Sequence, residues 1–141
     1  MPIILCRHGP TKKDKLKKNL YRNIAPRIAE LVGEVKVIYC SPLSRCLETA
    51  KILSWALNCE YVVKHKLSRL SCRCKSCKQS KIDYGRQLRD SSEPILLVTH
   101  SSCYRYIAEG LSERKKRERI EGSATSMFSY GETLIYNRGF V

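Results

Sequence analysis

The sequence predicts an α/β protein, a three-layer sandwich with a central, mostly parallel sheet and helices on both faces. Three short apolar runs indicate its strands, and each run ends at a turn or at a polar residue. Helix-like segments follow the second and third runs, and such alternation of strands and helices is typical of parallel sheets. The three runs are Ile3–Cys6, Val35–Tyr39 and Ile95–Thr99.

The helix predicted most firmly covers Ser44–Leu57, where apolar residues recur at helical spacing and Ser41 or Ser44 could cap the start. The other elements have weaker signals. They are helices over Arg27–Leu31 (opened by Pro26), over Ile82–Leu88 and from Ser101 toward Gly110, a short strand at Tyr61–Val63, and an edge hairpin of Thr125–Tyr130 and Thr133–Asn137.

Length and composition indicate one globular domain over residues 1–141. A chain of 141 residues with 43% apolar residues can bury a core without disulfides or metals. No apolar run approaches the roughly 18 residues that a membrane span needs. Arg7 interrupts the first run too early for a secretion signal. We therefore expect a cytoplasmic protein without a membrane partner, and the sequence does not predict its oligomeric state.

The chain is strongly basic, with 27 lysines and arginines against 13 acidic residues and a net charge of +14. Such a surface attracts anions of any kind, including phosphorylated metabolites, phosphoproteins and nucleic acid. The charge run Glu113–Arg119 could bind nucleic acid, but we interpret it as a solvated face. Nucleic acid is not the expected partner, because no aromatic residues are interleaved with the basic ones.

Two histidines and two arginines are expected to meet at one edge of the sheet. Arg7 and His8 follow the first strand, His100 follows the third, and Arg45 begins the helix after the second. The carboxyl ends of parallel strands form the crevice where open α/β sheets bind ligands. Arginine forks clamp phosphate oxygens, and a neutral histidine can attack phosphorus. The pattern therefore predicts a phosphate site.

These motifs resemble the histidine phosphatase superfamily, in its phosphoglycerate-mutase-like branch. The resemblance rests on Arg7-His8-Gly9, on the stretch Ser41–Ala50 and on the strand that ends in His100, and it covers nearly the whole chain. It implies that His8 is the phosphorylated nucleophile and that the two arginines and His100 hold the phosphoryl group. It implies no metal and no cofactor.

Three further residues are candidate substrate contacts. The backbone at Gly9 would fix the tautomer of the neighbouring histidine, and Thr11 would add a contact. Ser101 stands where the family commonly has glycine, and its hydroxyl could donate to phosphate.

The resemblance implies a histidine acid phosphatase-type phosphohydrolase that acts on a phosphomonoester or a phosphoamidate. Many members have a glutamate that protonates the leaving oxygen. The corresponding stretch here, His65–Arg73, has no carboxylate, and the nearest are Glu60 and Asp83. An acid-poor, compact chain is similar to the protein phosphohistidine phosphatases, and mutase activity is not expected. The expected partner is a phosphorylated small molecule or phosphoprotein. The alternative is a catalytically weak member that binds a phosphorylated ligand or nucleic acid.

Eight cysteines leave one question open. Four lie near the predicted strands, where a free thiol behaves as a small core residue. Cys72, Cys74 and Cys77 instead stand on a stretch predicted to be a basic loop, 71–81. They could bind zinc, with His65 or Cys59 as a fourth ligand, or remain free thiols with a regulatory redox role.

Overall fold

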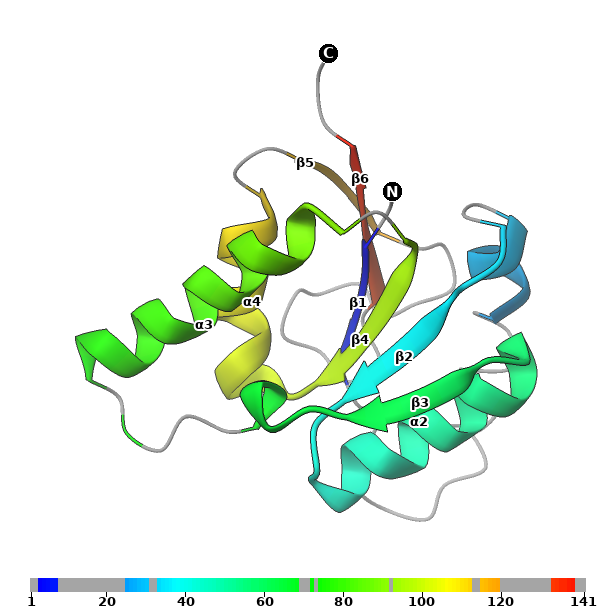
Figure 1. Ribbon diagram of the computed structural model, residues 1–141, viewed down its shortest axis with the longest axis horizontal. Helices are drawn as coiled ribbons and strands as arrows, with labels where there is room; N and C mark the ends of the chain where they lie inside the picture. Colours follow the sequence, from blue (N-terminus) through cyan, green and yellow to red (C-terminus); the bar gives the residue numbers. More distant parts are fainter. Residues whose placement is uncertain are drawn as a thin grey trace.

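A six-stranded sheet forms the centre of the protein, with the strand order β3-β2-β4-β1-β6-β5 (Figure 1). This computed structural model describes residues 3–7, 25–30, 33–68, 72, 74–91, 93–112, 115–119 and 133–138. The four strands β3, β2, β4 and β1 are parallel, and β6 and β5 complete the sheet in antiparallel pairing. The predicted α/β class with a mostly parallel sheet is confirmed.

The four parallel strands agree closely with the strands predicted from the sequence. β4 is the central strand, and all five of its residues are buried. The strand bounds are β1 Ile3–Arg7, β2 Val37–Cys40, β3 Glu60–Val63, β4 Ile95–Thr99, β5 Lys115–Arg119 and β6 Thr133–Arg138.

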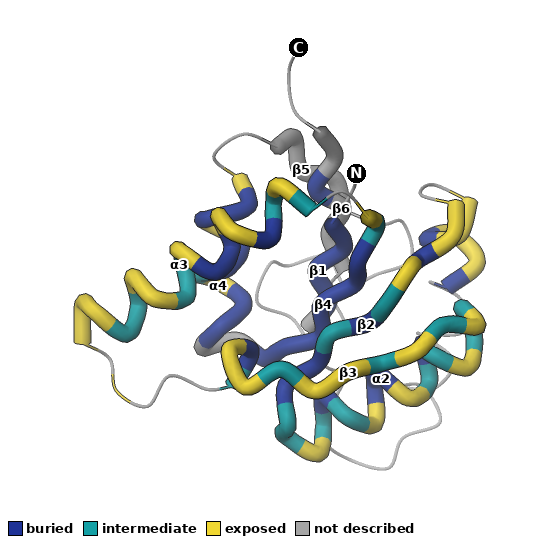
Figure 2. The backbone as a smooth tube through the Cα atoms, viewed as in Figure 1, coloured by how far each residue is buried: buried dark blue, intermediate teal, exposed yellow. Residues whose placement is uncertain are grey.

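Alternate residues of the central strands supply two cores, one on each face of the sheet. Figure 2 shows that β1 and β4 are buried along most of their length. Ile4 and Cys6 point to one face with α2 (Ser44–Leu57) and the helical residues 25–30. Ile3 and Leu5 point to the other face, which α3 (Lys75–Arg89) and α4 (Ser101–Ser112) cover. Both faces of β1 are therefore buried away from solvent, as expected for a sheet between two helical layers. Helices on both faces make the predicted three-layer sandwich.

The helices differ from the sequence predictions mainly at α3. The bounds of α2 are those predicted, and the helix predicted over Arg27–Leu31 is described over residues 25–30. α3 begins at Lys75, so a loop over residues 75–81 was a wrong prediction. Only Tyr84, Gly85 and Leu88 are buried in α3, and the helix extends from this packed part back through Lys81, Gln79, Lys78 and Lys75. Those side chains favour helix even without core contacts.

The charge run near the C-terminus forms a strand. Residues Lys115–Arg119 are β5, which pairs with β6 and ends the sheet. No strand had been predicted from the sequence for this run. β6 confirms the strand predicted over Thr133–Asn137, but it lies between β1 and β5 rather than at the edge. The other predicted strand of the hairpin, Thr125–Tyr130, lies outside the described residues.

Helices α3 and α4 cross at two glycines. A Cβ atom on Gly110 would collide with the carbonyl oxygen of Ile82 and lie 2.9 Å from the backbone nitrogen of Arg86. A Cβ atom on Gly85 would lie 3.2 Å from the Cα atom of Gly110. Because these contacts are with backbone atoms, the two helices would have to separate to admit any side chain.

Replacement of Gly110 by alanine tests this close crossing. Helix propensity alone would make Gly110→Ala stabilising by about 1 kcal/mol. We expect instead a loss of about 1–3 kcal/mol in the free energy of unfolding, because the added methyl group overpacks the crossing. The measurement is urea denaturation, with Glu109→Ala, at an exposed position of the same helix, as the control. A stabilised Gly110→Ala variant would contradict the close approach.

Candidate active site

The carboxyl ends of three parallel strands lie side by side. β4 is flanked by β1 and β2, with Arg7 in register with Thr99, and Cys40 in register with Val98. The backbone N–H of Ser41 donates to the carbonyl of Val98 at 3.0 Å, which extends the pairing one residue beyond β2. The chain segments that follow all three strands therefore start at one edge of the sheet.

Arg45 lies in the first turn of α2, as predicted, and its side chain is partly exposed. The capping residue is Leu43, without a side-chain cap, so neither Ser41 nor Ser44 caps the helix as proposed from the sequence. Ser41 is buried, and its hydroxyl accepts a hydrogen bond from the backbone N–H of Leu43 at 3.3 Å. This bond holds the turn that joins β2 to α2.

His100 joins β4 to α4 and is 4% exposed. Its carbonyl accepts hydrogen bonds from the backbone N–H groups of Cys103 and Tyr104, at 3.0 and 2.8 Å. The residue therefore occupies a fixed position at the start of α4. Because α2 and α4 both start at this edge, two helix N-termini contribute partial positive charge there.

The other predicted site residues are described only in part. Arg7 is the last residue of β1, and Ser101 opens α4; the structure describes the backbone of both and not their side chains. His8, Gly9 and Thr11 lie outside the described residues. Within the described part of the chain, the structure thus brings together the backbone of Arg7, Arg45 and His100 at one edge.

A long-range hydrogen bond that could not be predicted from the sequence lies beside this edge of the sheet. After β3, the 3₁₀ turn η1 (His65–Leu67) passes beside the end of β4. The hydroxyl of Thr99 donates to the carbonyl of Leu67 at 2.9 Å, and both residues are fully buried. Since 32 residues separate them, no local pattern could have indicated this contact.

Three thiols near the strand ends are held in the neutral form. Burial raises the pKa of Cys46 to about 12, against a smaller opposing effect of its hydrogen bond with Ser41. Burial also raises the pKa of Cys40 and of Cys103. A protonated thiol is a poor nucleophile, so these cysteines are core residues at neutral pH, as expected from the sequence.

The two carboxylates nearest in sequence to the missing acid lie in unsuitable places. Glu60 begins β3, in register with Val37, and therefore stands at the amino ends of the strands. Asp83 is exposed on α3, where it pairs with Arg86 at 3.0 Å and accepts a hydrogen bond from Gln79 at 3.0 Å. Neither is a suitable general acid for a group bound at the carboxyl ends.

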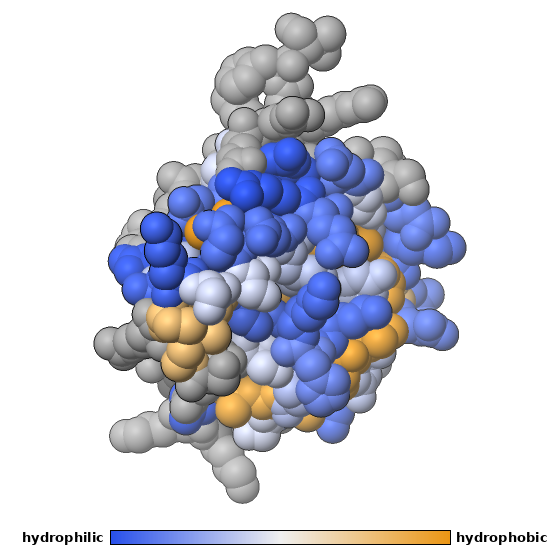
Figure 3. Space-filling model, turned by 60° about the vertical axis from the view of Figure 1, so that its left-hand side comes forward, coloured by the Kyte–Doolittle hydropathy of each residue, from blue (hydrophilic) through white to orange (hydrophobic). Residues whose placement is uncertain are grey.

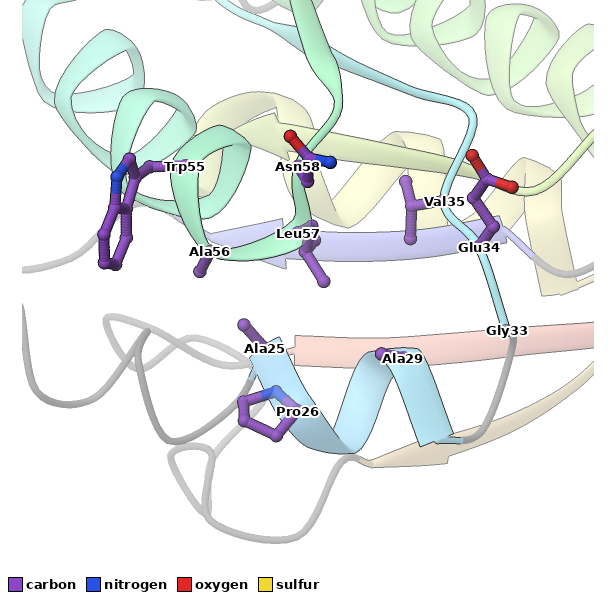
Figure 4. Close-up of a pocket in the computed structure, with 10 residues that line it drawn as sticks. All are labelled: Ala25, Pro26, Ala29, Gly33, Glu34, Val35, Trp55, Ala56, Leu57 and Asn58. Atoms are coloured by element: carbon purple, nitrogen blue, oxygen red, sulfur yellow. The ribbon is translucent and has the colours of Figure 1, made fainter.

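A cavity of about 500 Å³ lies at the opposite end of the sheet. It is lined by residues 25–29 of the first described helix, by the chain before β2 and by the end of α2 (Figure 4). In Figure 4 Ala25 and Leu57 face each other across it, and Trp55, which is 78% exposed, stands at its side. The cavity therefore lies away from the edge that carries Arg45 and His100.

Three exposed or half-buried cysteines form a second cluster, at the start of α3. Cys72 Sγ lies 2.8 Å from Cys74 Sγ, to which it donates, and 3.2 Å from Cys77 Sγ. The thiol hydrogen bond from Cys72 lowers the pKa of Cys74 to about 6, and the same bond raises the pKa of Cys72 to about 11. One of the three sulfurs is therefore ready to carry a negative charge.

Comparison with known proteins agrees with this α/β fold. The family model described as histidine phosphatase superfamily (branch 1) matches residues 3–72. The chain belongs to the histidine phosphatase superfamily. The matched segment includes Arg7, His8 and Arg45, whereas His100 lies beyond it. No curated protein sequence matches the chain significantly.

Solved structures share the fold at low sequence identity. YhfR from Bacillus stearothermophilus is 16% identical with a TM-score of 0.66, and the alignment covers 95% of this chain and 89% of YhfR. SixA from Agrobacterium tumefaciens, a candidate phosphohistidine phosphatase, is 14% identical with a TM-score of 0.64 and coverages of 97% and 90%. This near-complete alignment confirms the compact form of the fold.

A phosphoglycerate mutase from Plasmodium falciparum is a larger relative in fold. It is 22% identical with a TM-score of 0.56, and the alignment covers 76% of this chain. This chain spans 65% of the length of that mutase. About a third of the mutase thus has no counterpart in the alignment.

Removal of the Thr99 hydroxyl tests the support beneath the site. We expect Thr99→Val to lower the free energy of unfolding by about 1–3 kcal/mol, because the buried carbonyl of Leu67 loses its partner. The control is Thr49→Val, also at a buried threonine, whose hydroxyl donates to the carbonyl of Arg45 at 3.0 Å. That carbonyl lies inside α2, where backbone bonding continues without the hydroxyl. Equal losses in urea denaturation would argue against a special role for Thr99.

Proposed function

We propose that the protein is a phosphatase that hydrolyses its substrate through a phosphohistidine intermediate on His8. The observation that carries the proposal is the register of β1, β4 and β2, whose carboxyl ends lie side by side. His8 immediately follows Arg7, the last residue of β1. Membership of the histidine phosphatase superfamily supports the same chemistry.

Each proposed role follows from the chemistry of the side chain. A neutral ring nitrogen of His8 attacks phosphorus in line with the leaving group, and water later hydrolyses the phosphohistidine. Arg7 and Arg45 neutralise the phosphoryl oxygens through paired N–H donors, which lysine could not provide in the same geometry. A protonated His100 donates a further hydrogen bond. The N-termini of α2 and α4 favour the same negative charge.

A cysteine nucleophile is a poorer candidate. Cys40, Cys46 and Cys103 lie near the strand ends, and burial raises the pKa of all three. The thiolate is the attacking form of cysteine, and at neutral pH these groups stay protonated. Histidine needs no such activation, since its neutral form is abundant near pH 7.

The proposed substrate class rests on the lack of a carboxylate in the stretch His65–Arg73, where many family members have their general acid. Glu60 lies at the wrong end of the sheet, and Asp83 is engaged with Arg86. The leaving oxygen of an alkyl phosphate needs a proton from an acid, whereas the nitrogen leaving group of a phosphoamidate is displaced readily. We therefore propose a phosphoamidate such as phosphohistidine as the preferred substrate, with activated phosphomonoesters as weaker ones. SixA, similar in fold, is a candidate phosphohistidine phosphatase.

Hydrolysis of p-nitrophenyl phosphate in the presence of EDTA tests the route. We expect the wild type to turn over and His8→Ala to lose about a thousandfold or more of kcat, because the nucleophile is gone. The matched control is His65→Ala, which removes an exposed histidine of η1 and should leave kcat unchanged. A metal-free reaction is insensitive to EDTA.

Three results would separate the alternatives. Activity that survives His8→Ala would refute the phosphohistidine route. A folded wild type with no turnover would refute phosphatase activity and favour a protein that only binds phosphorylated ligands. Binding of nucleic acid that weakens steeply as salt rises would identify backbone phosphates as the ligand.

Dependence on the leaving group tests the substrate class. We expect kcat/KM for a phosphoamidate to exceed that for a simple alkyl phosphate by about 10²–10⁴, the factor that a positioned acid normally contributes. A steep decrease of rate with rising pKa of the leaving group, measured over a series of aryl phosphates, would show the same deficit. Equal values of kcat/KM across the series would contradict this substrate class, because they would show that an acid protonates the leaving oxygen.

A further inference from the structure

The cysteine cluster at the start of α3 brings three metal-ligating atoms together. The sulfur atoms of Cys72, Cys74 and Cys77 all lie within 4.8 Å of one another. Cys77 lies in the first turn of α3, Cys74 is its N-cap residue, and Cys72 precedes it by two residues. Among the described histidines, cysteines and acidic residues, no other group of three converges in this way.

The geometry suits a tetrahedral ion. Zinc bound by thiolates at about 2.3 Å places their sulfurs about 3.8 Å apart. The sulfur of Cys72 now lies 2.8 Å from that of Cys74 and 3.2 Å from that of Cys77. Rotation of the side chains can widen these distances, because Cys72 and Cys74 are exposed and Cys77 is only half-buried. The backbone of α3 does not have to move.

Local charge favours thiolates at this position. The backbone N–H of Cys77 donates to the sulfur of Cys74, and that of Cys74 donates to the sulfur of Cys72. Such N–H···S bonds orient ligands and stabilise their charge. The helix N-terminus and the lysines of its first turns, Lys75 and Lys78, add positive charge. Figure 3 brings this side of the molecule forward, and blue, hydrophilic side chains cover much of the face with smaller orange groups among them.

We propose that Cys72, Cys74 and Cys77 bind one Zn²⁺ ion through three thiolates, with the fourth position open to water or a small ligand. His65 and Cys59, the fourth ligands considered from the sequence, do not belong to the group. Binding releases the thiol protons to solvent, and no redox step is involved. The ion would hold the chain directly before α3. The Thr99–Leu67 hydrogen bond holds the chain a few residues earlier, at η1. It takes no part in phosphoryl transfer.

Titration of the reduced, metal-free full chain with Co²⁺ and then Zn²⁺ tests the site. We expect one equivalent of Co²⁺ to give sulfur-to-cobalt charge-transfer bands and the visible bands of a tetrahedral ion, and Zn²⁺ to displace it. Loss of an outer-shell partner typically costs about 10–100-fold in metal affinity, so loss of a ligand in Cys74→Ser or Cys77→Ser should cost at least that.

Cys59→Ser is the matched control, because Cys59 is half-buried and lies outside the cluster. It should bind Co²⁺ as tightly as the wild type, and circular dichroism should show all variants folded. Absence of stoichiometric Co²⁺ binding to the reduced wild type would overturn the proposal. A loss of Co²⁺ affinity in Cys59→Ser as large as that in Cys74→Ser or Cys77→Ser would also overturn it. A non-reduced protein lighter by two hydrogens, together with no binding after reduction, would overturn it in favour of a disulfide pair. Phosphatase activity is a separate readout, so its absence leaves this test unchanged.

Discussion

The parallel pairing of β1, β4 and β2 is the constraint on which the rest of the structure depends. It aligns three strand ends, so that segments far apart in the chain start from one edge. Two of them lead directly into α2 and α4, whose N-termini carry partial positive charge. An anion at this edge meets backbone dipoles before any side chain is considered. In the function that we propose, Arg45 and His100 hold a phosphoryl group where those dipoles already favour an anion.

The pairing is stable because both faces of the central strands are buried. The alternation of Ile3 and Leu5 with Ile4 and Cys6 serves two cores, so a shift of one residue would exchange the residues of both faces. The edge strand β5 is protected by charge. β5 carries four basic residues in five, and charge of this kind discourages pairing of an edge strand with another molecule. Basic charge thus has a structural use apart from ligand attraction.

Much of the fold could be predicted from the sequence, because the central strands and α2 have strong local signals. The failures have physical causes. The start of α3 lacks apolar periodicity, and Lys115–Arg119 lacks β-branched or aromatic residues, so tertiary pairing alone makes it a strand. Arg45 and His100 each follow a predicted strand, and this position alone indicated that both lie at the carboxyl edge of the sheet. The Thr99–Leu67 bond and the Gly85–Gly110 crossing join distant residues of ordinary type, and no local pattern marks them.

The most direct test of the convergence at this edge is a double-mutant cycle on phosphate binding. Isothermal titration calorimetry would measure the affinity of orthovanadate for the wild type, Arg45→Gln, His100→Gln and the double variant. Two side chains that hold the same anion are coupled, so the account predicts that the double variant loses less than the sum of the single losses, by about 0.5–3 kcal/mol. Additive losses, or single variants that bind as the wild type does, would contradict convergence on one phosphoryl group.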